Sequence, residues 1–499
     1  MNENEFAEPA GPALYSELAV NVSSLAERYK DLFLIGSAGF SSDPSYLRHI
    51  NVTTPENEMK PGSIHRRVPS FLSDPHTPNQ EFFADFIPDI QNPQWNFGPA
   101  DSISAGARTH NLALHGHTLA WYSQSPQWMV NIIPGFLAGG SFLSGNNFSR
   151  GSNPGPANGD AGNVQMDRET AQRIYYDHII SAMRHYSSAD VRYASSRLDN
   201  PETSGVFSLK SWDVLNEEIS ETLHSSIIRI YPDEWKNTLR NTSWLRAMNG
   251  DDWDDSSLNY VYLLFKYAHI AVPNSAMAAK FRENYAALPD YLKLDHHDEN
   301  GSIEKYIVPE PPVLYYNDFN LNNPTKAKAV YNMVRELNIL WQKDPLYDSR
   351  NLVEGIGMQA HYTISASLEK EVRASLELFK SLIDEKLLAA IAISELDMVC
   401  GANAPGGLLT GSSIPSQEQA DAAGYQFALL YKLFAEYSQY IERVTTWGFA
   451  EPGWMNHLLL FRNIDGEIYA APAYYGAYDP EKFIREHSYL DYFFKGTGK

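Results

Sequence analysis

Short apolar runs alternate along the chain with longer segments whose apolar positions recur at the spacing of a helix. The runs are almost continuously apolar, which is typical of parallel strands buried on both faces. They lie at residues 32–37, 49–53, 112–117, 209–215, 313–317, 352–358, 388–394 and 443–447. The helical segments lie at residues 101–109, 167–186, 258–270, 324–342, 368–385 and 416–437. Asp167 and Ser416 stand at expected N-caps, and Ser416 with Gln419 matches a capping box.

Strands that alternate with helices predict an α/β fold, and eight such strands are typical of a (β/α)8 TIM barrel. The competing arrangement is a doubly wound open sheet, but Gly-x-Gly-x-x-Gly does not follow the first strand. A barrel needs about 250 residues, and the surplus falls in loop-like insertions. The insertions lie at about residues 61–93, 134–162, 187–205 and 295–304. We expect residues 1–499 to form a single barrel domain with long loops at its C-terminal face.

The charge balance excludes several classes of partner. The 499 residues include 39 Lys or Arg and 61 Asp or Glu, so the formal net charge is −22. This balance disfavours nucleic acid and anionic membranes, which both need a basic face. Cys400 is the single cysteine, so an intramolecular disulfide is excluded. Apolar runs are too short for a membrane span and the N-terminus lacks signal-peptide features, so we expect a soluble protein, either cytoplasmic or secreted after cleavage.

Polar and aromatic side chains collect where the strands stop, and the chain is rich in rings, with 10 Trp, 30 Tyr and 23 Phe. Flat rings pack in cores but also stack on sugars. Glu217 follows the fourth strand and Glu395 ends the seventh, so the two can face each other across the barrel mouth. Such a pair fits glycoside hydrolysis, in which one carboxylic acid protonates the leaving oxygen while the other attacks or activates water.

Metal-assisted hydrolysis is a second interpretation of the same strand ends. His115 and His117 lie on one side of a strand, and His361 with Asp397 could complete a metal site. A sugar-binding barrel without catalysis is a third. Chelation and substitution of the two glutamates distinguish these alternatives.

Seven ordered motifs carry a resemblance to glycoside hydrolase family 10, the retaining endo-β-1,4-xylanases. They are TPENEMK at 54–60, GHTLAW at 116–121, WDVLNE at 212–217, YNDFN at 316–320, GIGMQAH at 355–361, SELD at 394–397 and TWG at 446–448. The resemblance extends from about residue 32 to residue 475. It implies a barrel enzyme that cleaves β-1,4-xylosidic bonds in xylan or xylo-oligosaccharides and needs neither a metal nor another cofactor. The oligomeric state stays open.

The resemblance also implies roles for individual residues. Glu217 would be the general acid/base and Glu395 the nucleophile, while the side chain of Glu218 would point away. His361 would orient Glu395, and Asn216 would bind the 2-hydroxyl of the attacked sugar. The other implied sugar contacts are Glu56, Asn57 and Lys60 in the glycone subsites, His117, Trp121 and Gln124 at the cleavage point, Gln359 near Asn216, and Trp447 and Trp454 above the cleft.

Four positions depart from the family pattern. Tyr122 stands where a histidine is usual, Phe319 where a tyrosine is usual, Pro61 in place of a tryptophan and Met455 in place of an arginine. Each change alters a contact near the cleft, and the two long insertions could wall part of it off. We hypothesise a narrowed specificity for short or decorated xylo-oligosaccharides, or for a glycosylated small molecule, over long xylan chains.

Overall fold

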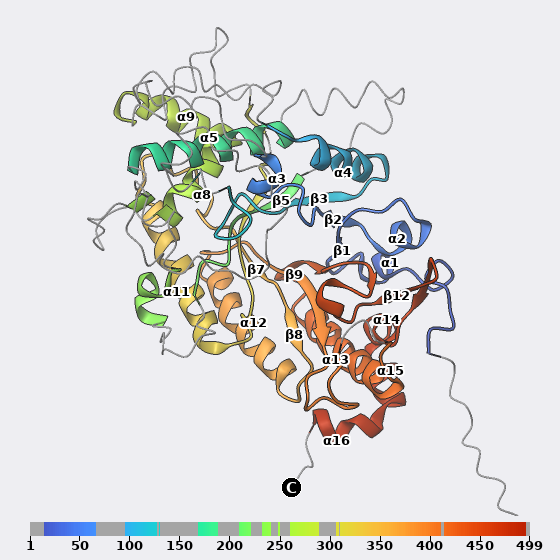
Figure 1. The fold of residues 1–499 in the computed structure, drawn as a ribbon. Helices are drawn as coiled ribbons and strands as arrows, with labels where there is room; N and C mark the ends of the chain where they lie inside the picture. Colours follow the sequence, from blue (N-terminus) through green and yellow to red (C-terminus); the bar gives the residue numbers. More distant parts are fainter. Residues whose placement is uncertain are drawn as a thin grey trace, which may run out of the picture.

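The computed structural model describes residues 14–65, 95–126, 129, 168–187, 209–220, 232–240, 248–249, 260–288, 306–308, 310–410 and 414–495. Within them, parallel strands form a closed barrel, because β10 pairs with both β1 and β9 (Figure 1). The barrel strands are β1 (Leu34–Ala38), β2 (Val52–Thr54), β3 (Ala113–Gly116), β5 (Leu209–Asn216), β6 (Val313–Asp318), β7 (Gly355–Met358), β9 (Ala390–Val399) and β10 (Ile441–Thr446). Each of these strands overlaps one apolar run, so the predicted TIM barrel is confirmed.

Several strand boundaries differ from the prediction; β9, for example, continues to Val399, five residues beyond the predicted end. The run at 49–53 begins too early, because His49 ends the short helix α2 (Pro44–His49), and β2 begins only at Val52. Asp43 caps this helix by accepting a hydrogen bond from the Ser45 N–H. A helix of 6 residues is too short to show a clear helical period of apolar positions, so its last residue was assigned to the apolar run that follows. Similarly, β3 ends at Gly116, one residue before the predicted end.

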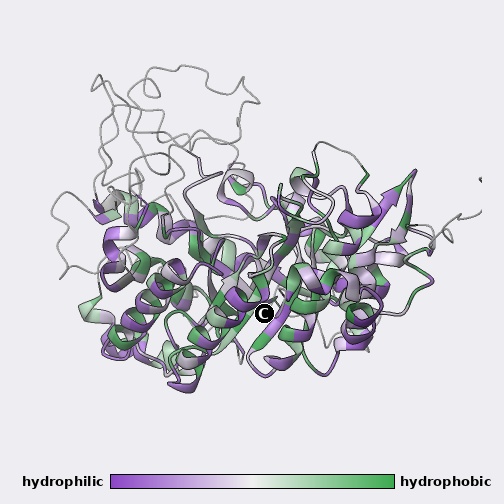
Figure 2. Ribbon diagram, turned by 90° about the horizontal axis from the view of Figure 1, so that it is seen from below, coloured by the Kyte–Doolittle hydropathy of each residue, from purple (hydrophilic) through white to green (hydrophobic). Residues whose placement is uncertain are grey.

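Helices cover the outside of the barrel, and α8 is buried at every position except Lys266. They are α1 (Leu25–Tyr29), α2, α3 (Pro61–Ile64), α4 (Gly98–Thr109), α5 (Arg168–Ser187), α8 (Tyr260–Ala271), α9 (Ser275–Asn284), α11 (Pro324–Trp341), α12 (Leu368–Asp384), α13 (Gln417–Glu436), α14 (Pro472–Tyr478), α15 (Pro480–Glu486) and α16 (Asp491–Phe494). Hydrophobic and hydrophilic stretches alternate along these helices (Figure 2). Ser416 and Gln419 form the predicted capping box of α13, whereas Asp167 lies outside the described residues. Short 3-10 turns occupy Pro232–Thr238, Tyr285–Ala287, Trp454–Asn456 and Ser488–Leu490.

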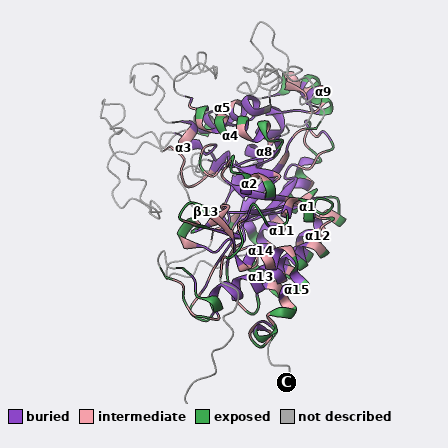
Figure 3. Cartoon of the chain, turned by 90° about the vertical axis from the view of Figure 1, so that its right-hand side faces the viewer, coloured by how far each residue is buried: buried purple, intermediate pink, exposed green. Residues whose placement is uncertain are grey.

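The core lies between the strands and the inner faces of the helices, where buried residues gather (Figure 3). Close packing inside the barrel requires glycine at two strand positions. A Cβ on Gly116 would lie 2.4 Å from the Trp212 ring, and one on Gly355 would lie 2.3 Å from the Tyr315 ring. These rings fill the space that larger side chains would otherwise occupy.

Two barrel strands resume after a break and extend the C-terminal face. β4 (Ala120–Trp121) pairs with the end of β5, and β8 (His361–Thr363) pairs with the end of β9. A small sheet of β11 (Ala450–Glu451), β12 (Phe461–Ile464) and β13 (Glu467–Ala470) follows β10. The breaks lift the side chains of β4 and β8 above the barrel, where barrel enzymes place their chemistry.

Most of the predicted insertions lie outside the described residues. Of 61–93 the structure describes only α3 and His65, and of 187–205 only Ser187 at the end of α5. Residues 134–162 and 295–304 lie wholly outside. Within the described part of the chain, no helix combines the length and apolar character needed to cross a bilayer.

Candidate active site

Glu217 directly follows β5 at the carboxyl end of the barrel. Its backbone is left-handed, with φ 58°, and its N–H donates to the Asn317 carbonyl at 2.8 Å. Val214 is an extra residue of β5 relative to β6, and bulges of this kind re-aim side chains at functional sites. The Glu217 carboxylate accepts hydrogen bonds from Trp121 Nε1 at 3.1 Å and Gln359 Nε2 at 2.9 Å. Donors from two other strand ends therefore hold this carboxylate.

Glu218 has a different environment from its neighbour. Its side chain is fully buried, whereas Glu217 is only half-buried. Burial raises the pKa of Glu218 well above its usual range. The two side chains therefore point into different surroundings, as predicted, but the left-handed turn at Glu217 after the end of β5, and not strand alternation, separates them. Of the two, only Glu217 reaches solvent.

Glu395 lies within β9 at a second bulge. Ser394 and Glu395 together oppose Thr445 of β10, since the register shifts between the pairs Val444 with Ile393 and Thr446 with Leu396. The Glu395 carboxylate accepts a hydrogen bond from Asn317 Nδ2 at 2.7 Å, and its other oxygen lies 3.1 Å from His361 Nε2. Glu395 therefore lies at a bulge and Glu217 shortly after one, and both carboxylates are held by side chains from other strands of the barrel.

Amide side chains connect the two glutamates. Asn317 Nδ2 donates to Glu395 and also to Asn216 Oδ1 at 3.0 Å. Gln359 Nε2 donates to the same Asn216 oxygen at 3.1 Å and to Glu217. The hydrogen bonds thus run without interruption from one carboxylate to the other, and they fix both relative to the barrel.

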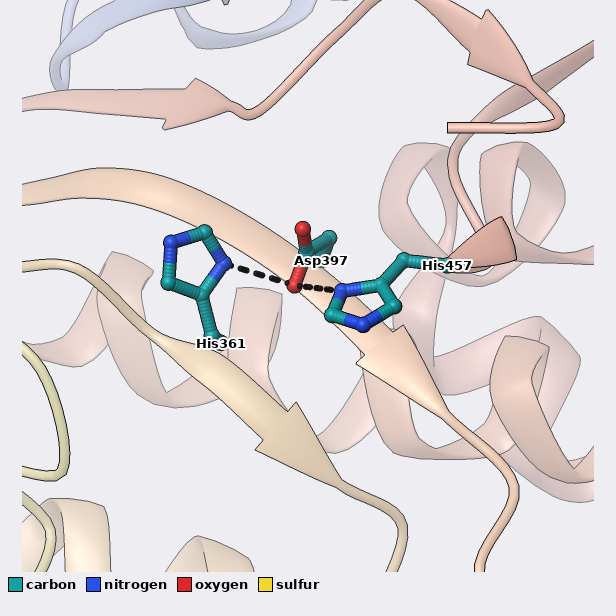
Figure 4. A group of neighbouring side chains, drawn as sticks. All are labelled: His361, Asp397 and His457. Carbon is teal, nitrogen blue, oxygen red and sulfur yellow. Dashed lines mark hydrogen bonds and ion pairs between the residues drawn. The ribbon is translucent and has the colours of Figure 1, made fainter. Parts of the chain in front are cut away.

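His361 lies between the carboxylates of Glu395 and Asp397. His457 contacts Asp397 from the other side (Figure 4). His361 Nδ1 donates to Asp397 Oδ1 at 2.9 Å, and His457 Nδ1 lies 2.7 Å from the same oxygen. Burial by itself would lower the pKa of His361, but Asp397 and Glu395 outweigh burial and raise it to about 10. His361 is therefore an imidazolium at neutral pH and donates from both ring nitrogens. It places a positive charge beside Glu395.

His361, Asp397 and His457 are also the described residues that come close enough to share a metal ion, with ligand atoms within 4.8 Å of one another. Their 2.7 and 2.9 Å contacts are hydrogen-bond lengths. Ligands on a tetrahedral zinc ion at about 2.0–2.1 Å stand about 3.3 Å apart. An ion would therefore have to push these three side chains apart, and the geometry is that of a relay in which His361 is hydrogen-bonded to Asp397 and His457 contacts the same carboxylate as an ion pair.

The histidine pair of the metal interpretation has a separate partner. His115 Nε2 and His117 Nδ1 lie 3.0 and 2.9 Å from the same oxygen of buried Asp213. Burial alone would raise the pKa of Asp213, but the two histidines hold it below its usual range. His361 and Asp397 do not join this group among the described residues. The four residues of the metal interpretation are thus divided between two clusters.

Lys60 lies on the other side of the site, between two tryptophan rings. Its Nζ is 4.8 Å from the Trp121 ring centre and 5.9 Å from that of Trp447. It donates to Asn57 Oδ1 at 3.1 Å, and Gln124 Nε2 lies 3.5 Å from the same oxygen. Burial lowers the pKa of Lys60, and nearby carboxylates partly offset that effect. These side chains form a polar wall flanked by rings, which suits a sugar.

The comparisons with known proteins can be set against this geometry. The sequence model of glycosyl hydrolase family 10 matches residues 33–280 and 308–479. The chain belongs to glycosyl hydrolase family 10.

Curated relatives of this family member include xylanases of different lengths. The endo-1,4-beta-xylanase A of Thermoanaerobacterium saccharolyticum is 24% identical over 481 residues, which cover 93% of this chain but 28% of that protein. The endo-1,4-beta-xylanase B of Paenibacillus barcinonensis is 24% identical over 439 residues, which cover 87% of this chain and 89% of that protein. The chain thus spans less than a third of the first relative and most of the second.

A solved structure has the same fold. It is a mutant of the intracellular xylanase of Thermoanaerobacterium saccharolyticum in complex with xylotetraose. The TM-score is 0.56 at 22% identity, and the match covers 92% of this chain and 98% of that one.

The remaining predicted contacts lie around the same mouth of this family 10 barrel. Trp447 is buried, with its ring edge-on to those of His117 and His361, whereas Trp454 is exposed and lies 5.3 Å from the His361 ring. Glu56 is half-buried and acts on Lys60 through its charge.

Sequence reasoning missed three site residues. Asn317 stood in a quoted motif without a role, His457 follows the Trp454 turn, and Arg240 lies outside every motif. A histidine three residues after a roof tryptophan was a signal for His457, whereas no pattern marked Arg240.

Two of the four departures from the family pattern meet at Arg240. Its Cζ atom lies 4.3 Å from the Tyr122 ring centre and 5.7 Å from that of Phe319. Pro61 begins α3 behind Lys60, and Met455 is exposed in the turn after Trp454. The departures from the family pattern therefore change the surroundings of Glu217 as well as the rim of the barrel mouth.

Proposed function

We propose that this chain cleaves β-1,4-xylosidic bonds in xylan or xylo-oligosaccharides with retention of configuration. The observation that carries the proposal is the unbroken amide network between Glu217 and Glu395, with imidazolium His361 beside Glu395 alone. Two carboxyl groups with unequal surroundings are what a double displacement requires. The family membership and the xylanase relatives support this substrate class.

The two glutamates then take different roles. Protonated Glu217 gives its proton to the glycosidic oxygen while Glu395 attacks the anomeric carbon, so the leaving sugar departs as an alcohol. The Glu217 carboxylate next takes a proton from water, and that water attacks the anomeric carbon and releases Glu395. His361 holds the Glu395 carboxylate in place before its attack and again after its release.

The surrounding residues are proposed as sugar contacts. Glu56, Asn57 and Lys60 bind the glycone side, and Asn216 with Gln359 lies close to the reacting sugar. His117, Trp121 and Gln124 line the cleavage point, and Trp447 and Trp454 cover it. We also propose that the whole chain is one catalytic domain.

The test is hydrolysis of xylohexaose and xylan, with the anomeric configuration of the first product followed by NMR. We expect the β-anomer first, unchanged rates after chelation, and a loss of about 10²–10⁴ in kcat/KM for Glu217→Gln on xylohexaose. Glu395→Gln should abolish turnover, and Glu486→Gln, an exposed glutamate of α15, should change nothing. An inverted product, or turnover that survives both active-site variants, would refute the proposal.

The same assay tests the hypothesis of narrowed specificity. That hypothesis depends mainly on insertions outside the described residues and stays a prediction. The hypothesis is supported if the oligosaccharides from xylotriose up to xylohexaose are cleaved faster than polymeric xylan, and the reverse order contradicts it.

A further inference from the structure

Arg240 lies beside the backbone that carries Glu217. The chain after the turn Pro232–Thr238 runs antiparallel to residues 218–220, with a bridge between Ile219 and Leu239. The Ser220 N–H donates to the Thr238 carbonyl at 2.7 Å, and the Arg240 N–H donates to the Glu218 carbonyl at 2.9 Å. The main chain of Arg240 is thereby fixed next to Glu217.

The side chain of Arg240 then reaches back to Glu217 itself. Its Nε donates a hydrogen bond to the Glu217 carbonyl. That carbonyl belongs to a residue in the left-handed conformation, which residues other than glycine adopt rarely and only where the surroundings hold them. Arg240 is one of the groups that hold it.

The guanidinium group also packs on Tyr122, whose hydroxyl lies close enough to Glu217 to feel its charge. Its Cζ atom is 4.3 Å from the Tyr122 ring centre, within the range of a cation–π contact, and Phe319 lies near the same group at 5.7 Å. Burial, the charge of Glu217 and a hydrogen bond to Glu217 raise the pKa of the Tyr122 hydroxyl to about 12. Arg240 therefore contacts Glu217 at its main chain and, through Tyr122, at its side chain.

We propose that Arg240 is a positioning residue for Glu217, and that Tyr122 and Phe319 are the two surfaces against which it is held. This inference rests on the proposed function of Glu217 as acid/base. It gives the departures at Tyr122 and Phe319 a shared reason, because both rings face one guanidinium. The charges of Asp318 and Glu217 also act on Arg240 and raise its pKa, so its side chain stays a guanidinium cation.

The effect of a misplaced Glu217 on the rate of cleavage depends on the leaving group. The hydroxyl oxygen of a sugar leaves only when it receives a proton, so departure of the leaving sugar requires a correctly placed Glu217. A dinitrophenolate leaves without a proton, so the kcat/KM of a dinitrophenyl glycoside depends on attack by Glu395 alone. Misplacement of Glu217 should therefore slow the natural bond selectively, whereas general loosening of the fold slows both.

The test compares Arg240→Met with the wild type on xylohexaose and on dinitrophenyl β-xylobioside. We expect kcat/KM to fall by about tenfold or more on xylohexaose and by less than about twofold on the aryl glycoside. Arg28→Met is the matched control, because Arg28 also stacks on a tyrosine, at 5.5 Å from Tyr29, and also donates Nε to a backbone carbonyl, but on the far exposed helix α1.

Equal losses on both substrates, or no loss on either, would overturn the proposal. Arg240→Lys keeps the charge but loses the planar Nε donor. If the methionine variant does not fold, the losses in kcat/KM of Arg240→Lys on the two substrates are compared instead. Tyr122→Phe should reproduce the selective loss more weakly. A wild type that cleaves neither substrate contradicts the proposed function instead, so the two failures are distinguishable.

Discussion

The side-chain amide of Asn317 donates a 2.7 Å hydrogen bond to Glu395 Oε1. The second proton of the same amide goes to Asn216, and its oxygen accepts from the Ser394 hydroxyl at 2.6 Å. All of the strong hydrogen-bonding positions of the amide are used, so its orientation is fixed. Asn317 therefore sets the position of the proposed nucleophile from β6, which is separated from β9 by β7.

Replacing Asn317 by alanine should slow attack on the sugar. A hydrogen bond to a charged group contributes about 1.5–3 kcal/mol, so kcat/KM should fall by about tenfold to a hundredfold. Steady-state kinetics on xylohexaose checks this, together with the melting temperature. Asn284→Ala, at the exposed end of α9, is the control. An activity within twofold of the wild type would show that the amide does not position Glu395.

His457→Gln should weaken the relay that leads through Asp397 and His361 to Glu395. We expect kcat/KM to fall by about threefold to tenfold, equivalent to about 1 kcal/mol, because the 2.7 Å contact of His457 Nδ1 with Asp397 Oδ1 is lost. The loss should be the same on xylohexaose and on dinitrophenyl β-xylobioside, because both reactions need the nucleophile. This pattern is the opposite of that expected for Arg240→Met. A loss confined to xylohexaose would contradict the relay.

His361 should make the stability of the protein fall at alkaline pH. Its pKa is about 10 in the folded protein against an ordinary value of 6.5, so in this window the folded state holds a proton that the unfolded chain has released. The contribution is complete below about pH 6.5 and is lost as the pH rises to about 10. Urea unfolding at pH 7, 8, 9 and 10 should show a shallower decline for His361→Gln than for the wild type. The exposed His110→Gln should follow the wild type.

The buried ion pair of Lys326 and Asp318 should be sensitive to loss of one partner. Their charged atoms are 2.8 Å apart and both side chains are fully buried. Lys326→Met leaves the carboxylate unpaired and should lower the free energy of unfolding by about 3–5 kcal/mol. Lys30→Met removes an exposed pair with Glu27 and should cost at most about 1 kcal/mol. Similar losses in the two variants would contradict this interpretation.

The hydrophobic pattern was sufficient to predict the barrel, because each strand and each long helix is specified by its own local sequence. Apolar runs at 313–317 and 388–394 became β6 and β9, and Ser416 caps α13 as expected. The error at 49–53 arose where a helix of 6 residues ended inside an apolar run, which periodicity cannot resolve.

The sequence by itself determined the eight-stranded barrel, the two candidate glutamates and the family, since these depend on local patterns and short motifs. Only the tertiary structure decided how the glutamates are held. The bulges beside Val214 and at Glu395 arise from the register of the closed barrel, and no local pattern specifies register. His457 and Arg240 reach the site from distant segments, because packing of the whole chain brings them there.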